Sequence, residues 1–253
     1  GLLLSAFLLR GLPPSELASC GDPPEPVFEQ RWSIRLTVGR GVDPELAREQ
    51  VRRAQAWWAP WGLWLDSGEV GRIDAVWAVQ APPGEGEEAM RRALAPLRAA
   101  LAELPPAPDG VVDVLVLGRI GAPRAPVPRD IRGLALGGPP ILEGEDDGLA
   151  PRLVGLLGPG TSPMILLSDE GLRALRTDEA DTVLAHEIGH LLGLGHRRER
   201  GNLMSPGSVR CLPGLDAAQR LALRGPPIAV EGEGEAAPGV EGAPAVEAGG
   251  KLP

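Results

Sequence analysis

Hydrophobic and polar residues alternate over residues 31–39. The apolar members of this segment share one face of an extended chain: Trp32, Ile34, Leu36 and Val38. This period of two predicts a strand with one buried face. Residues 111–117 are apolar at all positions but Asp113, which is typical of a central strand buried on both faces. Shorter apolar runs predict four more strands, over 62–65, 73–79, 133–137 and 164–167.

Helix signals lie between and after these strands. Asp43 followed by Pro44 predicts an N-cap and a first helical residue, and this helix ends before Pro60. Three other helices are predicted over 87–104, from Asp178 to Gly193, and from Asp216 to about Arg224. Strands and helices in this order predict an α/β (α+β) fold with a mixed, twisted sheet and a small C-terminal subdomain.

Composition and charge divide the chain further. The 253 residues are 43% hydrophobic, enough for a substantial core, and the net charge is −9. No basic patch with interleaved aromatic residues occurs, so we expect no nucleic-acid partner. Residues 226–253 are rich in Gly, Pro and Glu and are predicted to be disordered. We expect a leader-like segment over 1–30, a main domain over 31–225 and a tail over 226–253, in a monomer.

The N-terminal segment has several interpretations. Its first ten residues are apolar, too short to span a bilayer, and resemble the core of a signal peptide. Residues 17–20 resemble a bacterial lipobox with Cys20 as the lipidated residue. Cys20 could instead form a disulfide with Cys211, the only other cysteine, act as an inhibitory thiolate, or remain free. We expect an extracytoplasmic protein, secreted or lipid-anchored at the cell envelope, and the Gly- and Pro-rich composition favours a bacterial origin.

The chemistry-bearing residues gather in one short stretch. All three histidines of the chain lie there: His186, His190 and His196. His186 and His190 share a helix face, and Gly193 can adopt the left-handed conformation that ends the helix and brings His196 back. Three imidazoles leave one tetrahedral position open, as a catalytic zinc requires. Glu187 is placed to take a proton from a zinc-activated water, so the stretch predicts a zinc hydrolase.

This stretch, H-E-I-G-H-L-L-G-L-G-H followed by Asn-Leu-Met-Ser-Pro, resembles the metzincin clan of zinc endopeptidases, with spacing most similar to the matrixins. The resemblance implies a zincin-like fold with its active-site helix below a cleft, and makes 31–225 the catalytic domain. It implies that His186, His190 and His196 bind zinc, that Glu187 is the general base, and that Met204 is the Met-turn residue.

The chain departs from matrixins after the third histidine, where Arg197 replaces a serine. Matrixins also hold a second, structural zinc with further histidines, which this chain lacks, so we expect one zinc ion. The acidic run Glu143, Glu145, Asp146 and Asp147 is either a solvated loop or a weakly supported calcium site.

The resemblance also implies a protein or peptide substrate. An extended substrate would add to the edge strand formed by Gly133, Leu134, Ala135 and Leu136, with Leu134 and Leu136 on the core and Ala135 on an uncrowded face. The alternatives are a zinc-retaining binding or processing protein and an amidase that acts on cell-wall peptides.

Overall fold

The computed structural model describes residues 18–20, 24–27, 29–75, 87–105, 107–108, 110–120, 132–137, 163–175, 179–206 and 210–224. Most of the predicted leader, the acidic run at 143–147 and the predicted tail at 226–253 lie outside these residues. The domain boundaries and the calcium site therefore stay predictions. No helix in the described ranges has both the length and the apolar character needed to cross a membrane.

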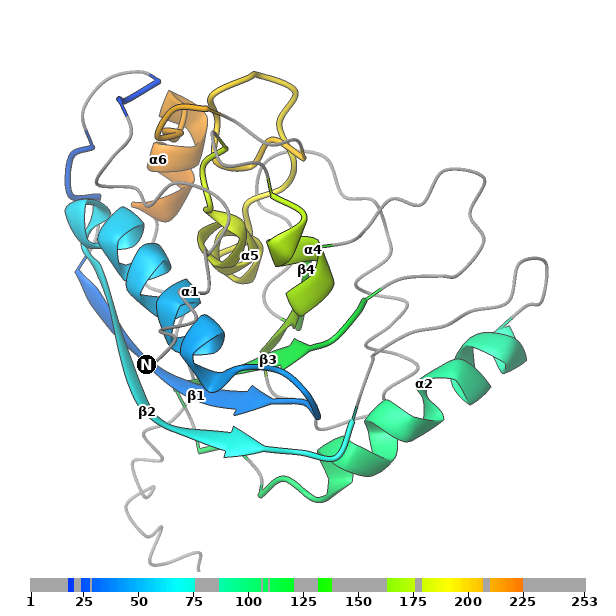
Figure 1. Cartoon of the computed structure of the whole chain (residues 1–253). Helices are drawn as coiled ribbons and strands as arrows, with labels where there is room; N and C mark the ends of the chain where they lie inside the picture. The colour runs from blue at the N-terminus through cyan, green and yellow to red at the C-terminus, as the bar shows by residue number, and fades with distance from the viewer. Residues whose placement is uncertain are drawn as a thin grey trace, which may run out of the picture.

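Five strands form one mixed sheet in the order β2-β1-β3-β5-β4 (Figure 1). They are β1 (Gln30–Val38), β2 (Leu63–Arg72), β3 (Val111–Leu117), β4 (Gly133–Leu136) and β5 (Met164–Ser168). β1 is parallel to β2 and β3, and β3 is parallel to β5. β4 pairs antiparallel with β5 at the edge of the sheet. The predicted mixed sheet is confirmed, and among the described strands β4 lies at an edge, as predicted.

The second strand differs from the prediction. One continuous strand covers 63–72, where two short strands were expected, and Ile73 follows its end. Residues 76–79 of the second predicted strand lie outside the described ranges. The side chains after Leu65 in β2 are mostly exposed, so the sequence there shows no alternation of apolar and polar residues. It is held as a strand by backbone pairing with β1, which does not require apolar side chains.

Helices cover both faces of the sheet. They are α1 (Pro44–Trp58), the short 3-10 helix η2 (Ala59–Trp61), α2 (Glu87–Ala102), α4 (Asp169–Arg173), α5 (Val183–Leu191) and α6 (Ala217–Leu223). α1 and α5 share one hydrophobic core with Val114 and Val116 of β3. Leu94 and Leu97 of α2 pack with Leu115 on the opposite face. β3 is therefore buried on both sides, as predicted.

The helix that carries His186 and His190 begins later than predicted. Asp178 is not its N-cap, because α5 starts at Val183 and Thr182 stands at the cap position without a side-chain hydrogen bond to the helix. The α6 prediction is confirmed: the Asp216 side chain accepts a hydrogen bond from the Gln219 amide at 2.8 Å. The five-residue helix α4 was not predicted, since it is too short to show a helical period.

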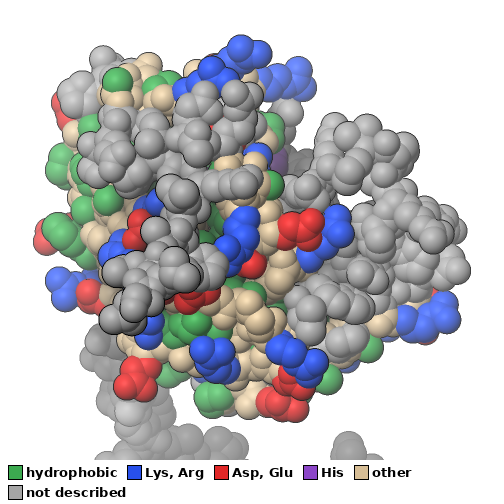
Figure 2. Space-filling model, in the orientation of Figure 1, with side chains coloured by type: hydrophobic (Ala, Val, Ile, Leu, Met, Phe, Trp, Pro, Cys, Tyr) green, Lys and Arg blue, Asp and Glu red, His purple; other side chains and the backbone are tan. Residues whose placement is uncertain are grey.

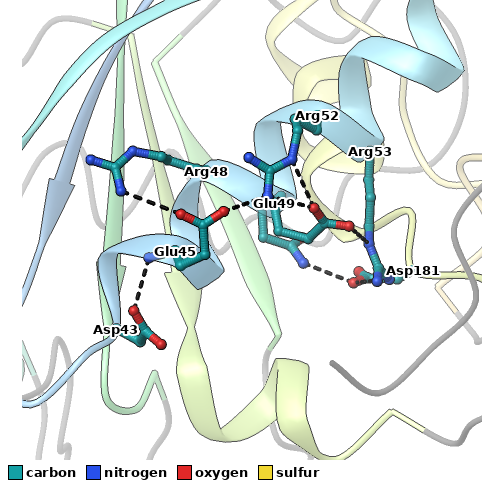
Figure 3. Close-up of polar contacts among 8 residues, drawn as sticks. Asp43, Glu45, Arg48, Glu49, Arg52, Arg53 and Asp181 are labelled. Atoms are coloured by element: carbon teal, nitrogen blue, oxygen red, sulfur yellow. Dashed lines mark hydrogen bonds and ion pairs between the residues drawn. The ribbon is translucent and has the colours of Figure 1, made fainter. Parts of the chain in front are cut away.

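The segment before α5 is tied to α1 by a buried ion pair (Figure 3). Asp181 is 2% exposed, and its Oδ2 accepts hydrogen bonds from Arg53 Nη1 and from Gln50 Nε2, both at 2.8 Å. Burial raises the pKa of the Asp181 carboxyl, and the Arg53 guanidinium opposes that rise. Glu49 accepts a hydrogen bond from Arg53 Nε at 2.8 Å.

Two tryptophans of α1 extend the same attachment. Trp58 Nε1 donates to the carbonyl of Ala185 in α5 at 3.1 Å, and Trp57 Nε1 donates to the carbonyl of Pro213 at 2.9 Å. Both indoles are buried and so have their single donor satisfied. α1 thus holds both α5 and the chain around Pro213 against the sheet.

We predict that Arg53→Met lowers the free energy of unfolding by roughly 3–5 kcal/mol, because it leaves the Asp181 carboxylate buried beside an apolar side chain. Arg52→Met, in the adjacent exposed ion pairs, is the matched control and should cost less than about 1 kcal/mol. Urea denaturation followed by circular dichroism measures both. Similar small losses in the two variants would contradict a structural role for the buried pair.

Candidate metal centre

The end of α5 reverses the chain so that a third histidine meets the first two. His186 and His190 lie one turn apart on the helix, with ring centroids 4.8 Å apart. Gly193 follows the C-cap with φ of 83°. The Gly193 amide donates to the His190 carbonyl and the Leu194 amide to the Gly189 carbonyl, both at 2.9 Å. This pair of bonds is a Schellman ending, and it returns the chain over the helix with His196.

The three imidazoles form one group. Their potential ligand atoms all lie within 4.8 Å of one another, and His190 Nε2 lies 3.2 Å from His196 Nε2. Two nitrogens bound to one tetrahedral zinc at its usual bond length would be about 3.3 Å apart. The spacing of this pair therefore fits a zinc ion.

Backbone carbonyls determine which ring nitrogen of His186 and of His190 would bind a metal ion. His186 Nδ1 lies 2.7 Å from the Leu203 carbonyl, and His190 Nδ1 lies 2.8 Å from the Leu194 carbonyl. A carbonyl can only accept, so each Nδ1 carries the proton and each Nε2 keeps a lone pair for the metal. Burial, with a contribution from His190, lowers the pKa of His186 to about 3. His186 is thus neutral at physiological pH, the form that binds metal.

Glu187 points toward the edge strand. Its side chain is 6% exposed, and a Cβ on Gly133 of β4 would lie 2.6 Å from Glu187 Oε1. Gly133 was predicted only as part of a substrate strand, and the structure adds that its missing side chain leaves room for the carboxylate. Ala135 does not face open space as predicted. It is buried in the core that α5 shares, because α5 covers that face of β4.

Met204 is fully buried and lies against Gly189 of α5. A Cβ on Gly189 would overlap Met204 Sδ, so any larger residue at this position of α5 would force the buried methionine to shift. The turn that carries Met204 is closed by Asn202, whose Oδ1 accepts from the Met204 amide at 2.8 Å. The Met204 carbonyl in turn accepts from the Arg197 amide at 2.9 Å, next to His196.

Arg197, the residue that departs from the matrixin pattern, pairs with the cap of α6. Its Nε lies 3.0 Å from Asp216 Oδ2. Figure 2 shows a group of basic side chains at the top of the molecule, where the chain between α5 and α6 lies in Figure 1. Three exposed ones in that segment are Arg198, Arg200 and Arg210. The surface of this subdomain is therefore rich in positive charge although the whole chain is acidic.

The structure joins Cys20 and Cys211 in a disulfide, with Cα atoms 5.2 Å apart. The Cys20 amide donates to the Leu212 carbonyl at 2.9 Å, and the Leu212 amide donates to the Ala18 carbonyl at 2.8 Å. Cys20 also packs on Gly201, two residues before the Met-turn carbonyl that meets His186. Of the states predicted for Cys20, the structure therefore has the disulfide. A sulfur in a disulfide cannot also carry a lipid or act as a free thiolate.

Sequence reasoning missed two residues of the centre, Asn202 and Gln219. Asp216 and Gln219 have the spacing of a capping box, which could have revealed the contact of Gln219 with its own helix. The contact of Gln219 with Asn202 joins residues 17 positions apart, and no local pattern indicates it.

We predict that Gly189→Ala destabilises the fold by about 1–3 kcal/mol, because the added methyl group must displace a buried methionine. Gly214→Ala is the matched control, since a Cβ there meets no atom within 4 Å. Thermal unfolding of the two variants measures the difference. An unchanged melting temperature in Gly189→Ala would show that Met204 does not pack as described.

The comparisons with known proteins agree with this geometry. Residues 166–211, from β5 through the Met-turn to Cys211, match the family model Peptidase_M10, described as matrixin. No curated protein matches the chain.

Two solved structures are similar to the chain. Archaemetzincin from Methanopyrus kandleri has 17% identity and a TM-score of 0.41, over 79% of this chain and 96% of its own. Metalloproteinase-II from Bacteroides fragilis has 14% identity and a TM-score of 0.44, over 87% of this chain and 58% of its own. The family match over 166–211 agrees with the resemblance drawn from the motif: the segment that holds the three histidines and the Met-turn is similar to the matrixin family model, and the histidines form a group that could hold a metal ion.

Proposed function

We propose that this protein is a zinc endopeptidase in which Glu187 is the general base. The observation that carries the proposal is the position of Glu187, adjacent to the ligand His186 and with its carboxylate against Gly133 of the edge strand. A bound zinc supplies Lewis-acid chemistry, lowering the pKa of a water and polarising a carbonyl. Glu187 takes the proton from the attacking water and passes it to the amine that leaves as the peptide C–N bond breaks.

The outer edge of β4 supports a peptide as substrate. The Ser168 amide donates to the Arg132 carbonyl, and the two strands pair in the register Gly133–Leu167 to Leu136–Met164. Alternate antiparallel pairs exchange hydrogen bonds, so Leu134 and Leu136 bond to β5. The N–H and C=O groups of Gly133 and Ala135 point the other way, and no described strand pairs with them.

An extended peptide can therefore bond to Gly133 and Ala135 as an added strand. Such binding would place a peptide carbonyl beside the residue that contacts Glu187. It favours proteins or long peptides over the small cell-wall amides that an amidase would use. A binding protein that merely retained zinc would need the histidines but not the buried carboxylate of Glu187.

We also propose that the protein works outside the cytoplasm. The Cys20–Cys211 disulfide supports this location, because disulfides persist in oxidising compartments. The apolar start of the chain is consistent with export. Non-reducing mass spectrometry of protein taken from the culture medium and from cell fractions tests both points.

We predict that Glu187→Gln lowers peptide hydrolysis by on the order of 10²–10⁴-fold while the protein keeps its zinc, since only the base is removed. Glu199→Gln is the matched control, because Glu199 is exposed on the loop after His196. Fluorogenic peptide assays and metal analysis measure the two properties. A Glu187→Gln variant as active as the wild type would refute the assigned role.

We predict that Ala135→Pro lowers stability less than Leu134→Pro does, still binds zinc, and loses most cleavage of long peptides. Proline removes an amide that faces the substrate edge, not one bonded to β5. Leu134→Pro is the contrasting variant and should destabilise the fold, because its amide bonds to β5. Circular dichroism, metal analysis and peptide cleavage separate the two. Normal cleavage by Ala135→Pro would place the substrate elsewhere.

A further inference from the structure

We propose that the amide pair of Asn202 and Gln219 is a positioning element of the zinc site, through which α6 sets the orientation of His186. The inference concerns metal binding. It rests on the three histidines holding zinc and not on the identity of the peptide substrate.

The two amides bind each other directly. Asn202 Nδ2 donates to Gln219 Oε1 at 2.8 Å, and Gln219 Nε2 donates to Asn202 Oδ1 at 3.3 Å. Both residues are buried, and Gln219 is completely so. Buried amides that satisfy each other are costly to separate, because an unpaired amide in the interior loses its hydrogen bonds without gaining water.

Each amide also bonds to a backbone group that determines which way it faces. Asn202 Oδ1 accepts from the Met204 amide at 2.8 Å, and Gln219 Oε1 accepts from the Asp216 amide at 3.0 Å. Backbone N–H groups only donate, so the atom facing each must be the amide oxygen. Neither side chain can flip, and the pair has a single arrangement.

The arrangement reaches the metal ligand through one peptide unit. Asn202 and Met204 bracket Leu203, whose carbonyl lies 2.7 Å from His186 Nδ1. The Leu203 amide, which belongs to the preceding peptide unit, donates to the Gly214 carbonyl at 2.8 Å, so both peptide units that flank the Leu203 Cα are held. A carbonyl held in place fixes both the tautomer and the ring plane of the histidine that it contacts.

The same helix cap also reaches the third ligand. Gln219 and Asp216 form the capping box of α6, and Asp216 pairs with Arg197, the residue after His196. The start of α6 is thus connected to the residues that place two of the three histidines. A role confined to capping α6 would not require the additional bonds to Asn202.

The test compares zinc affinity with stability in four variants. Asn202→Ser keeps a short acceptor for the Met204 amide but cannot reach Gln219. Gln219→Met keeps the length of the side chain and removes its hydrogen bonds. The double variant tests whether the two residues act as a unit. Gln219→Glu keeps the shape of the side chain but replaces the donor that faces Asn202 Oδ1 with a negatively charged acceptor. Leu223→Ala is the control, because Leu223 packs from α6 onto the core and its side chain has no polar atom that could bond to the pair.

Zinc dissociation constants are measured by competition with a chelator, and the visible spectrum of the cobalt(II) form reports the ligand geometry. We expect each single variant to weaken zinc binding about tenfold, as for other partners of metal-bound histidines, and to alter the cobalt spectrum. The double variant should bind zinc no more weakly than the single variant with the lower zinc affinity, because the two residues act as one unit. Leu223→Ala should lower the melting temperature of the metal-free protein but keep both the zinc affinity and the spectrum.

Unchanged zinc affinity in Asn202→Ser and Gln219→Met would overturn the proposal. So would an equal loss of affinity in Leu223→Ala at matched melting temperature, which would mean that stability alone is measured. If Asn202→Ser does not fold, Gln219→Glu decides between the same outcomes. Wild-type peptide cleavage is assayed separately, so a failure here would leave the proposed function standing.

Discussion

The packing of α5 against the sheet is the constraint on which the site depends. This nine-residue helix carries two zinc-binding histidines and Glu187, and it is too short to be stable alone. It is held by the core it shares with α1, by Met204 below it and by the Asp181–Arg53 pair before it. Any movement of α5 would move His186, His190 and the Glu187 carboxylate together. The buried Asp181–Arg53 pair, which is costly to desolvate, therefore lies where it fixes the position of α5.

Three glycines allow this close packing, each for a different reason. Gly133 leaves space for Glu187, Gly189 leaves space for Met204, and Gly193 adopts the left-handed conformation that reverses the chain. In the first two cases the methyl group of an alanine would meet a buried functional side chain. Glycine at these positions brings the Glu187 carboxylate against an edge strand and a sulfur against a helix.

Much of the fold and of the centre followed from local patterns. Alternation identified β1, a continuous apolar run identified β3, and the spacing of the histidines identified the metal group. Contacts between distant segments were not predictable: Asn202 with Gln219, and Asp181 with Arg53, whose partners lie 17 and 128 positions apart. Asp181 illustrates the difficulty, since an acidic residue before a helix also has the composition of an N-terminal turn. Only the tertiary structure shows that it pairs with α1 instead.

We propose that one zinc ion, held by the three histidines beside Glu187, is responsible for peptide cleavage. The most direct measurement is a zinc titration of the chelated protein during hydrolysis of a long fluorogenic peptide. We expect no cleavage without metal and a rate that rises to a plateau at one zinc per chain, since the three histidines are the only ones in the sequence. Cleavage by the metal-free protein, or a plateau that requires two ions per chain, would contradict it.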